Sequence, residues 1–160
     1  MQTDSLISIL HLLTAIVALA TGAIVLMAAK GTMFHKRAGY VFAGSLLLVN
    51  ATAAGMYKLT GTFNFLHVFV LVSLFSLGYG MAAAIRRKSA NWLSRHVRGM
   101  TGAALGVWAA GFAELAVRVL PGILGPRQII GVAIGVGVVF FFLIGFLIDR
   151  FLKNTTGYSS

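Results

Sequence analysis

Four histidines are the residues of this sequence whose chemistry stands out, and two of them share a spacing. His11 precedes Lys30 by 19 residues, and His67 precedes Arg86 by the same 19. At a rise of 1.5 Å per residue, a helix would hold both imidazoles about 28 Å from these basic residues. Ionisable groups inside apolar runs are costly and usually functional, so the two histidines are predicted to pair at one depth of a membrane.

The other two histidines stand at the start of the following apolar runs, each with a basic neighbour. His35 is followed by Arg37, and His96 by Arg98, two residues later in both cases. The spacing from outer to inner histidine is 24 residues in the first half of the chain and 29 in the second. The difference predicts a longer loop in the second half. The chain is thus predicted to repeat a helical hairpin in one orientation, with a pseudo-twofold axis along the membrane normal.

Two imidazoles that approach from opposite helices can hold a haem iron from both sides and leave no position open for oxygen or substrate. The sequence therefore predicts two non-covalent haem b groups, with outer ligands His11 and His67 and inner ligands His35 and His96. Basic side chains beside the inner pair are candidates to bind its propionates: Lys36, Arg37, Arg95 and Arg98. Small residues would leave room for the macrocycles: Ala15, Ala18, Gly22, Gly99, Gly102, Ala103 and Gly106.

Each of these features also has a simpler interpretation. A histidine near a helix end is often an interfacial anchor, and basic residues beside a membrane follow the positive-inside rule. Stripes of glycine and alanine usually serve helix packing. Histidines that bind a copper or zinc ion are a further alternative, although such an ion would usually need three or four converging ligands.

The elements that must position these residues are predicted to be transmembrane helices. Of the 160 residues, 59% are hydrophobic and only three are acidic. A hydrocarbon layer about 30 Å thick needs roughly 20 apolar helical residues. Five runs meet this length: Ser5 to Ala29, Ala38 to Tyr57, Phe63 to Ile85, Val97 to Leu120 and Gln128 to Ile148. The predicted fold is an all-α membrane protein, a single transmembrane domain over 1–160. Its four-helix bundle core comes from two repeats, 5–57 and 63–120, with a peripheral fifth helix at 128–148.

Charge predicts the orientation of these helices. The chain has 13 Lys and Arg residues and a net charge of +10. They gather in the gaps between apolar runs, which favours a topological role over a nucleic-acid partner. The side with the larger share is predicted to be cytoplasmic, so that the N-terminus lies outside a bacterial inner membrane and the C-terminus inside. The first helix lacks a basic leading segment and is expected to be retained. The absence of cysteine excludes disulfides and covalently attached c-type haem.

Three further features are predicted to serve packing or proton transfer. Asn50 lies deep in the second run and is expected to hydrogen-bond to a neighbouring helix. Glu114 and Arg118 have the i,i+4 spacing of a buried ion pair, and Glu114 is also a candidate proton acceptor beside an outer quinol site. The fifth run is a candidate face for a homo-oligomer or partner protein through three glycines, Gly131, Gly135 and Gly137.

The stretch "HLLTAIVALATGAIVLMAAKGTMFHKRAGYVFAGSLLLVNATA", followed by "FLHVFVLVSLFSLGYG" and "RHVRGM", resembles a family of small bacterial membrane proteins of unknown function. Its distinctive core is Lys30, Gly31, Thr32, His35, Arg37 and Gly39. The placement of histidines on alternate helices is also similar to the ascorbate-dependent transmembrane di-haem b-type cytochromes. That resemblance of layout implies a four-helix core in which the four histidines are axial ligands. The fifth run, which has no histidine, departs from the pattern.

The predicted function is transmembrane electron transfer by a bis-histidine di-haem cytochrome, an oxidoreductase-type activity. Its expected partners are membrane lipid, a quinone and a redox protein. One alternative is a non-enzymatic accessory or assembly protein with structural or metal-binding histidines. Another is a small transporter, which would more typically show inverted repeats and helices broken at mid-membrane.

Overall fold

The protein is an all-α chain in its computed structural model, which describes the backbone of residues 2–60 and 66–156 and the side chains of 6–55, 68–125 and 127–154. The helices are α1 (Gln2–Met27), α2 (Met33–Thr60), α3 (Leu66–Arg86), α4 (Trp92–Val119) and α5 (Pro126–Thr156), with a short 3-10 turn η1 (Leu120–Gly122) before α5. Each of the five helices is long and apolar enough to cross a membrane. The predicted fold class of a multi-pass helical membrane protein is confirmed, and the helices are compatible with a bundle.

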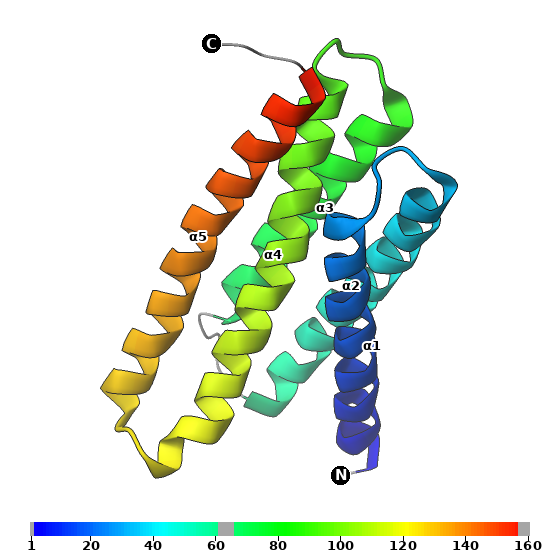
Figure 1. Ribbon diagram of the computed structural model, residues 1–160. Helices are drawn as coiled ribbons and strands as arrows, with labels where there is room; N and C mark the ends of the chain where they lie inside the picture. The colour runs from blue at the N-terminus through cyan, green and yellow to red at the C-terminus, as the bar shows by residue number, and fades with distance from the viewer. Residues whose placement is uncertain (1, 61–65, 157–160) are drawn as a thin grey trace. The chain divides into compact units, whose positions relative to one another are not determined.

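The chain divides into two compact units, 1–74 and 75–160, and the division falls within α3. In the first unit α1 and α2 form a hairpin whose helices pack along each other (Figure 1). The core of this unit includes Ala18 of α1 and Phe42 and Leu46 of α2, which are almost completely buried. Leucine and phenylalanine at i and i+4 on one helix face are what an amphipathic packing stripe requires.

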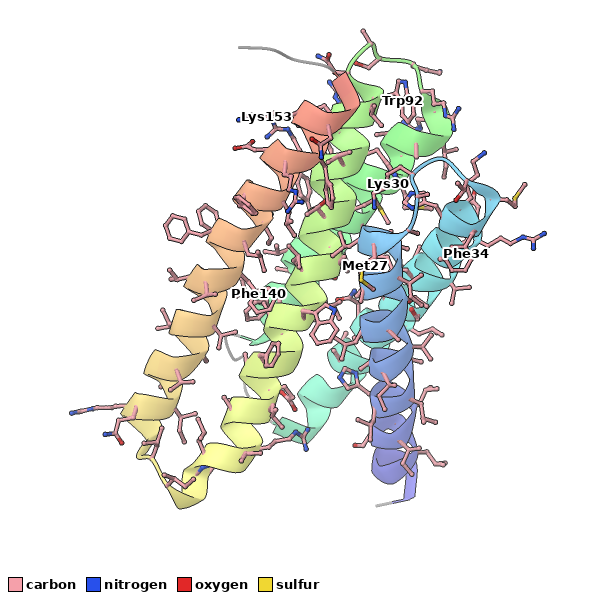
Figure 2. The ribbon with its side chains drawn as sticks, in the orientation of Figure 1. Met27, Lys30, Phe34, Trp92, Phe140 and Lys153 are labelled. Carbon is pink, nitrogen blue, oxygen red and sulfur yellow. The ribbon has the colours of Figure 1, made fainter. Side chains whose placement is uncertain are left out.

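The loop between α1 and α2 is built from three consecutive residues with separate roles. Lys30 Nζ donates to the carbonyls of Val25 and Leu26 at 2.9 and 2.6 Å, which satisfies the end of α1. Gly31 has a φ of +80°, a conformation that favours glycine. Thr32 Oγ1 accepts from the backbone N–H of His35 at 3.1 Å and so caps the start of α2. Figure 2 shows Lys30 just beyond the end of α1, close to Met27.

Partial burial also affects the side chain of Lys30. Partial burial lowers the pKa of Lys30, because a charged ammonium group is less well solvated there than in water. The hydrogen bonds of Lys30 and Thr32 and the conformation of Gly31 thus give these three residues a structural role in the turn between α1 and α2.

Gly31 allows a direct test of this turn. We expect Gly31→Ala to lower the free energy of unfolding by about 1 kcal/mol, because an L side chain is strained at positive φ. Gly39→Ala is the matched control, since a Cβ there meets nothing within 4 Å and the residue is helical. The measurement is unfolding by SDS titration in mixed micelles. Equal stability of the two variants would contradict the role of Gly31.

In the second unit, α4 and α5 form a hairpin joined through η1 (Figure 1). Aromatic rings line their contact. The ring of Phe112 in α4 forms tilted contacts with Trp108 on its own helix and with Phe140 of α5, at centroid separations of 5.9 Å for both. The start of α5 is fixed by Gln128, whose Oε1 accepts from the backbone N–H of Gly125 at 2.9 Å. Beyond this contact the described side chains of α5 are mostly exposed, and Ala133 and Ile148 are its buried apolar residues.

The loop between α3 and α4 is closed by an arginine rather than a glycine. Arg87 has a φ of +46°. Its Nε donates to the carbonyl of Ala84 at 3.0 Å, and its guanidinium lies 4.8 Å from the centroid of the Trp92 ring. These contacts stabilise a backbone conformation that would otherwise favour glycine.

The helix ends correct one expectation about the repeat. Both interhistidine loops contain five residues, 28–32 and 87–91, so the second loop carries no insertion. The difference between spacings of 24 and 29 lies instead within the helices. His67 stands 19 residues before the end of α3, against 16 for His11 in α1. His96 is the fifth residue of α4, and His35 the third of α2.

Candidate haem-ligand site

His11 lies on the protein-facing side of α1. It shares that side with Thr14, Ala18 and Gly22, all of them buried, at the i, i+3, i+7 and i+11 positions of one helix face. Its ring nitrogen Nδ1 is 2.9 Å from Oγ1 of Thr52 in α2. The predicted small residues below His11 therefore belong to the buried face.

The contacts of Thr52 assign the tautomer of His11. Oγ1 of Thr52 carries one hydrogen and lies 2.7 Å from the carbonyl of Leu48 and 2.9 Å from that of Val49. A threonine in a helix commonly donates to such carbonyls. With its hydrogen directed there, the hydroxyl accepts from the imidazole, so Nδ1 carries the proton. In the neutral ring the lone pair is then on Nε2.

His96 shows the same tautomer by a different route. Its Nδ1 is 3.0 Å from the carbonyl oxygen of Gly80 in α3. A carbonyl can only accept, so Nδ1 of His96 carries the proton and Nε2 the lone pair. Metal-binding histidines typically donate their second ring nitrogen to a carbonyl or similar acceptor, which orients the ring and raises its basicity. His96 also begins the buried stripe of α4 that continues through Met100, Ala103 and Val107.

His35 has the corresponding place in α2. It is half-buried, its Nδ1 atom is buried, and the stripe continues through Ala38, Phe42 and Leu46. The three histidines with described side chains therefore face protein rather than lipid. His35 belongs to the first unit and His96 to the second, and their pairing stays a prediction.

His67 is the second residue of α3, and its side chain lies outside the described residues. His67 and His11 stand at different distances from the ends of their helices. Measured from the ends of α3 and α1, His67 stands 19 residues away and His11 stands 16. At 1.5 Å per residue the difference is about 4.5 Å, less than one helical turn. The two reference residues differ, because Lys30 lies in a loop whereas Arg86 ends a helix, and the equal depth of His11 and His67 stays a prediction.

The four basic residues proposed for the propionates are all exposed: Lys36, Arg37, Arg95 and Arg98. All are helical, in the first two turns of α2 and α4. A residue two positions along a helix is turned by about 200°, so Arg37 and Arg98 lie on the side opposite the histidines. Arg98 Nε donates to Ser94 Oγ at 3.3 Å. Their exposure suits the positive-inside rule as well as a propionate role.

The glycines near His96 have different surroundings. A Cβ added to Gly99 would lie 2.5 Å from the Cα and N of Gly80 and 2.7 Å from the Ser76 carbonyl oxygen. Gly99 thus serves close packing of α4 on α3, which corrects its assignment to macrocycle clearance. At Gly102 an added Cβ would be 3.4 Å from Ser76 Oγ, whereas at Gly106 it would meet nothing within 4 Å. Gly106 remains a candidate for clearance.

Two other predicted polar contacts are present. Asn50, buried in α2, donates from Nδ2 to Oγ of Ser73 in α3 at 3.1 Å, which confirms its role in joining helices. Arg118 NH2 is 2.6 Å from Glu114 Oε1, as the i,i+4 spacing predicted. The pair is not buried, because the two side chains are 64% and 38% exposed. It lies near the end of α4, where long side chains reach the membrane interface.

Sequence reasoning missed Thr52 and Gly80 as partners of the histidines. Thr52 precedes Tyr57 in an apolar run and resembles any other packing hydroxyl, and a carbonyl acceptor leaves no mark on residue type. Among the side chains that the structure describes, no group of three or more His, Cys, Asp or Glu could hold a metal ion. No protein-family model, curated protein or solved structure matches the chain.

Proposed function

We propose that the protein is a b-type cytochrome that transfers electrons across a membrane through two haems, each held by two histidines. The observation that carries this proposal is that Nδ1 of both His11 and His96 lies within hydrogen-bond distance of an oxygen on a neighbouring helix. With Thr52 and Gly80 as acceptors, Nδ1 of each ring carries the proton. The lone pair of the neutral ring is then on Nε2, which would be the atom that binds iron.

The burial of the histidines supports the same function. His11, His35 and His96 each lie on the stripe of their helix that faces protein. The rings of His11 and His96, which also form hydrogen bonds, are preorganised, since they need not rotate from lipid toward a bound group. His67 completes the set as the fourth ligand in this proposal.

The proposed division of labour follows from these contacts. When bound, haem supplies reversible one-electron chemistry at its iron. The residues of the chain orient the haem ligands. Thr52 and Gly80 orient two imidazole rings, while Asn50 and Ser73 join α2 to α3. Lys36, Arg37, Arg95 and Arg98 offer positive charge to propionates at the inner side. A quinol in the outer leaflet is the proposed electron donor, with a redox protein as acceptor.

We also propose a bacterial inner-membrane location with the N-terminus outside. The two five-residue loops and the helical turns beside them carry eight basic residues: Lys30, Lys36, Arg37, Arg86, Arg87, Lys88, Arg95 and Arg98. The positive-inside rule places this side in the cytoplasm.

The test of the proposed function is an optical spectrum. Protein purified after expression with sufficient haem precursor is expected to be red. Its reduced-minus-oxidised difference spectrum should show the sharp bands of low-spin b-type haem, and a pyridine haemochrome assay should give about two haems per chain, one for each pair of ligands. Colourless protein that takes up no added haem would refute the proposal.

A second function is favoured by the same hydrogen bonds. A non-enzymatic accessory protein could use His11 and His96 simply to join α1 to α2 and α3 to α4. The haem assay separates the two functions, because an accessory protein of this kind would fold and remain colourless.

A further inference from the structure

We infer that Thr52 is a positioning residue, which determines the ring nitrogen of His11 that carries the proton and thereby presents Nε2 as the ligand atom. The part that concerns iron rests on the proposed function. The part that concerns the tautomer does not, because it follows from contacts between α1 and α2 alone.

The inference starts from a chain of hydrogen bonds. His11 Nδ1 lies 2.9 Å from Thr52 Oγ1, and that hydroxyl donates to the backbone carbonyls of Leu48 and Val49. Each bond in such a chain polarises the next, so the hydroxyl is a better acceptor than an isolated one. The carbonyls thus hold the hydroxyl hydrogen, and the hydroxyl oxygen holds the imidazole proton on Nδ1.

Two threonines of α1, Thr14 and Thr21, form hydrogen bonds of a different kind. Thr14 Oγ1 donates to the carbonyls of Leu10 and His11, and Thr21 Oγ1 donates to that of Val17 at 2.6 Å. These bonds stay within the helix and contact backbone rather than the ring. Thr52 differs because it reaches from α2 to an imidazole on α1.

The contact between His11 and Thr52 would alter the bond between the His11 ring and a bound iron. Donation of Nδ1–H to an acceptor makes the imidazole more basic and strengthens its bond to oxidised iron. Removal of the acceptor is therefore expected to raise the reduction potential of the haem that His11 binds. The haem bound through His96 should be unaffected, since its acceptor is the Gly80 carbonyl.

The first experiment uses the full-length protein without haem, labelled with ¹⁵N in its histidines and studied in detergent well above the ordinary imidazole pKa of about 6.5. His11 is expected to show a protonated Nδ1 and an unprotonated Nε2, its signals assigned by their loss in His11→Gln. Thr52→Val should shift this tautomer toward Nε2–H. Thr52→Ser, which keeps the hydroxyl, and Thr21→Val, the matched control, should leave it unchanged.

The second experiment titrates the potentials of the haem-loaded protein. Thr52→Val should raise one of the two potentials, and Thr52→Ser should restore it. An unchanged tautomer in Thr52→Val, or a wild-type His11 protonated on Nε2, would overturn the positioning role. Unchanged potentials with a changed tautomer would overturn the effect on iron. Failure to bind any haem would refute the proposed function while the tautomer result still stood.

Discussion

Replacing His96 with alanine is expected to remove one of the two proposed haems and leave the other. The pyridine haemochrome content should fall by about half, because a non-covalent haem that lacks one of its two axial imidazoles would be held weakly and lost during purification. His11→Ala should remove the other haem, and the double variant should be colourless. Since the two histidines hydrogen-bond to different partners, Thr52 and Gly80, we expect their effects to be independent.

Met100→Leu is the control for His96→Ala. Met100 lies one turn beyond His96 on the same buried stripe, and its sulfur could in principle bind iron. Its Cγ lies near the position that a Cβ on Gly80 would occupy, so we assign it to packing. The variant should retain both haems.

Loss of the His96 hydrogen bond also affects stability, by about 1 kcal/mol. Circular dichroism of the variants therefore checks that a colourless protein is still helical. A folded His96→Ala protein with full haem content would contradict the proposed ligand set.

The largest effect on stability is expected from Gly99→Ala. The new Cβ would lie 2.5 Å from two backbone atoms of Gly80 and 2.7 Å from the Ser76 carbonyl oxygen. Backbone atoms cannot rotate away, so α3 and α4 must separate and the bond from His96 to Gly80 must lengthen. Overpacking of this kind typically costs 1–3 kcal/mol, so we expect a loss of about 3 kcal/mol, measured by SDS titration in mixed micelles.

Gly106→Ala on the same helix is the matched control for Gly99→Ala. Its added Cβ would meet nothing within 4 Å, and alanine is the better helix former, so its stability should be unchanged or slightly higher. Similar stability of the two variants would show that α3 and α4 do not approach as closely as Gly80 and Gly99 indicate.

The membrane-spanning helices could be predicted from the sequence because their determinant is local. A run of apolar residues long enough for a bilayer is visible without knowledge of any partner, and all five runs became helices. The ends of the helices are harder to predict from the sequence, because basic residues indicate the gaps between the apolar runs. The structure instead begins α2 at Met33 and α4 at Trp92, so that His35 and His96 with their basic neighbours are helical.

The surroundings of the histidines were only partly predictable. Spacing along one helix placed His11 above Ala18 and Gly22, and the structure puts all three on one buried face. Contacts between helices depend on rotation and register, which spacing does not give. The bond from Asn50 was expected because an amide deep in an apolar run must find a partner. The acceptor of His96 could not be predicted, because every residue has a carbonyl oxygen.

That difference in acceptors makes the two histidines unequal in how freely their surroundings can evolve. The ring of His96 is held by the main-chain oxygen of Gly80, where an added Cβ would lie 2.8 Å from the backbone nitrogen of Met100 and 3.0 Å from the backbone carbon of Gly99. The ring of His11 is held by a hydroxyl that one codon change can delete. One substitution could therefore change the contact of His11 alone, whereas a substitution that disturbs the acceptor of His96 also disturbs the packing of α3 on α4.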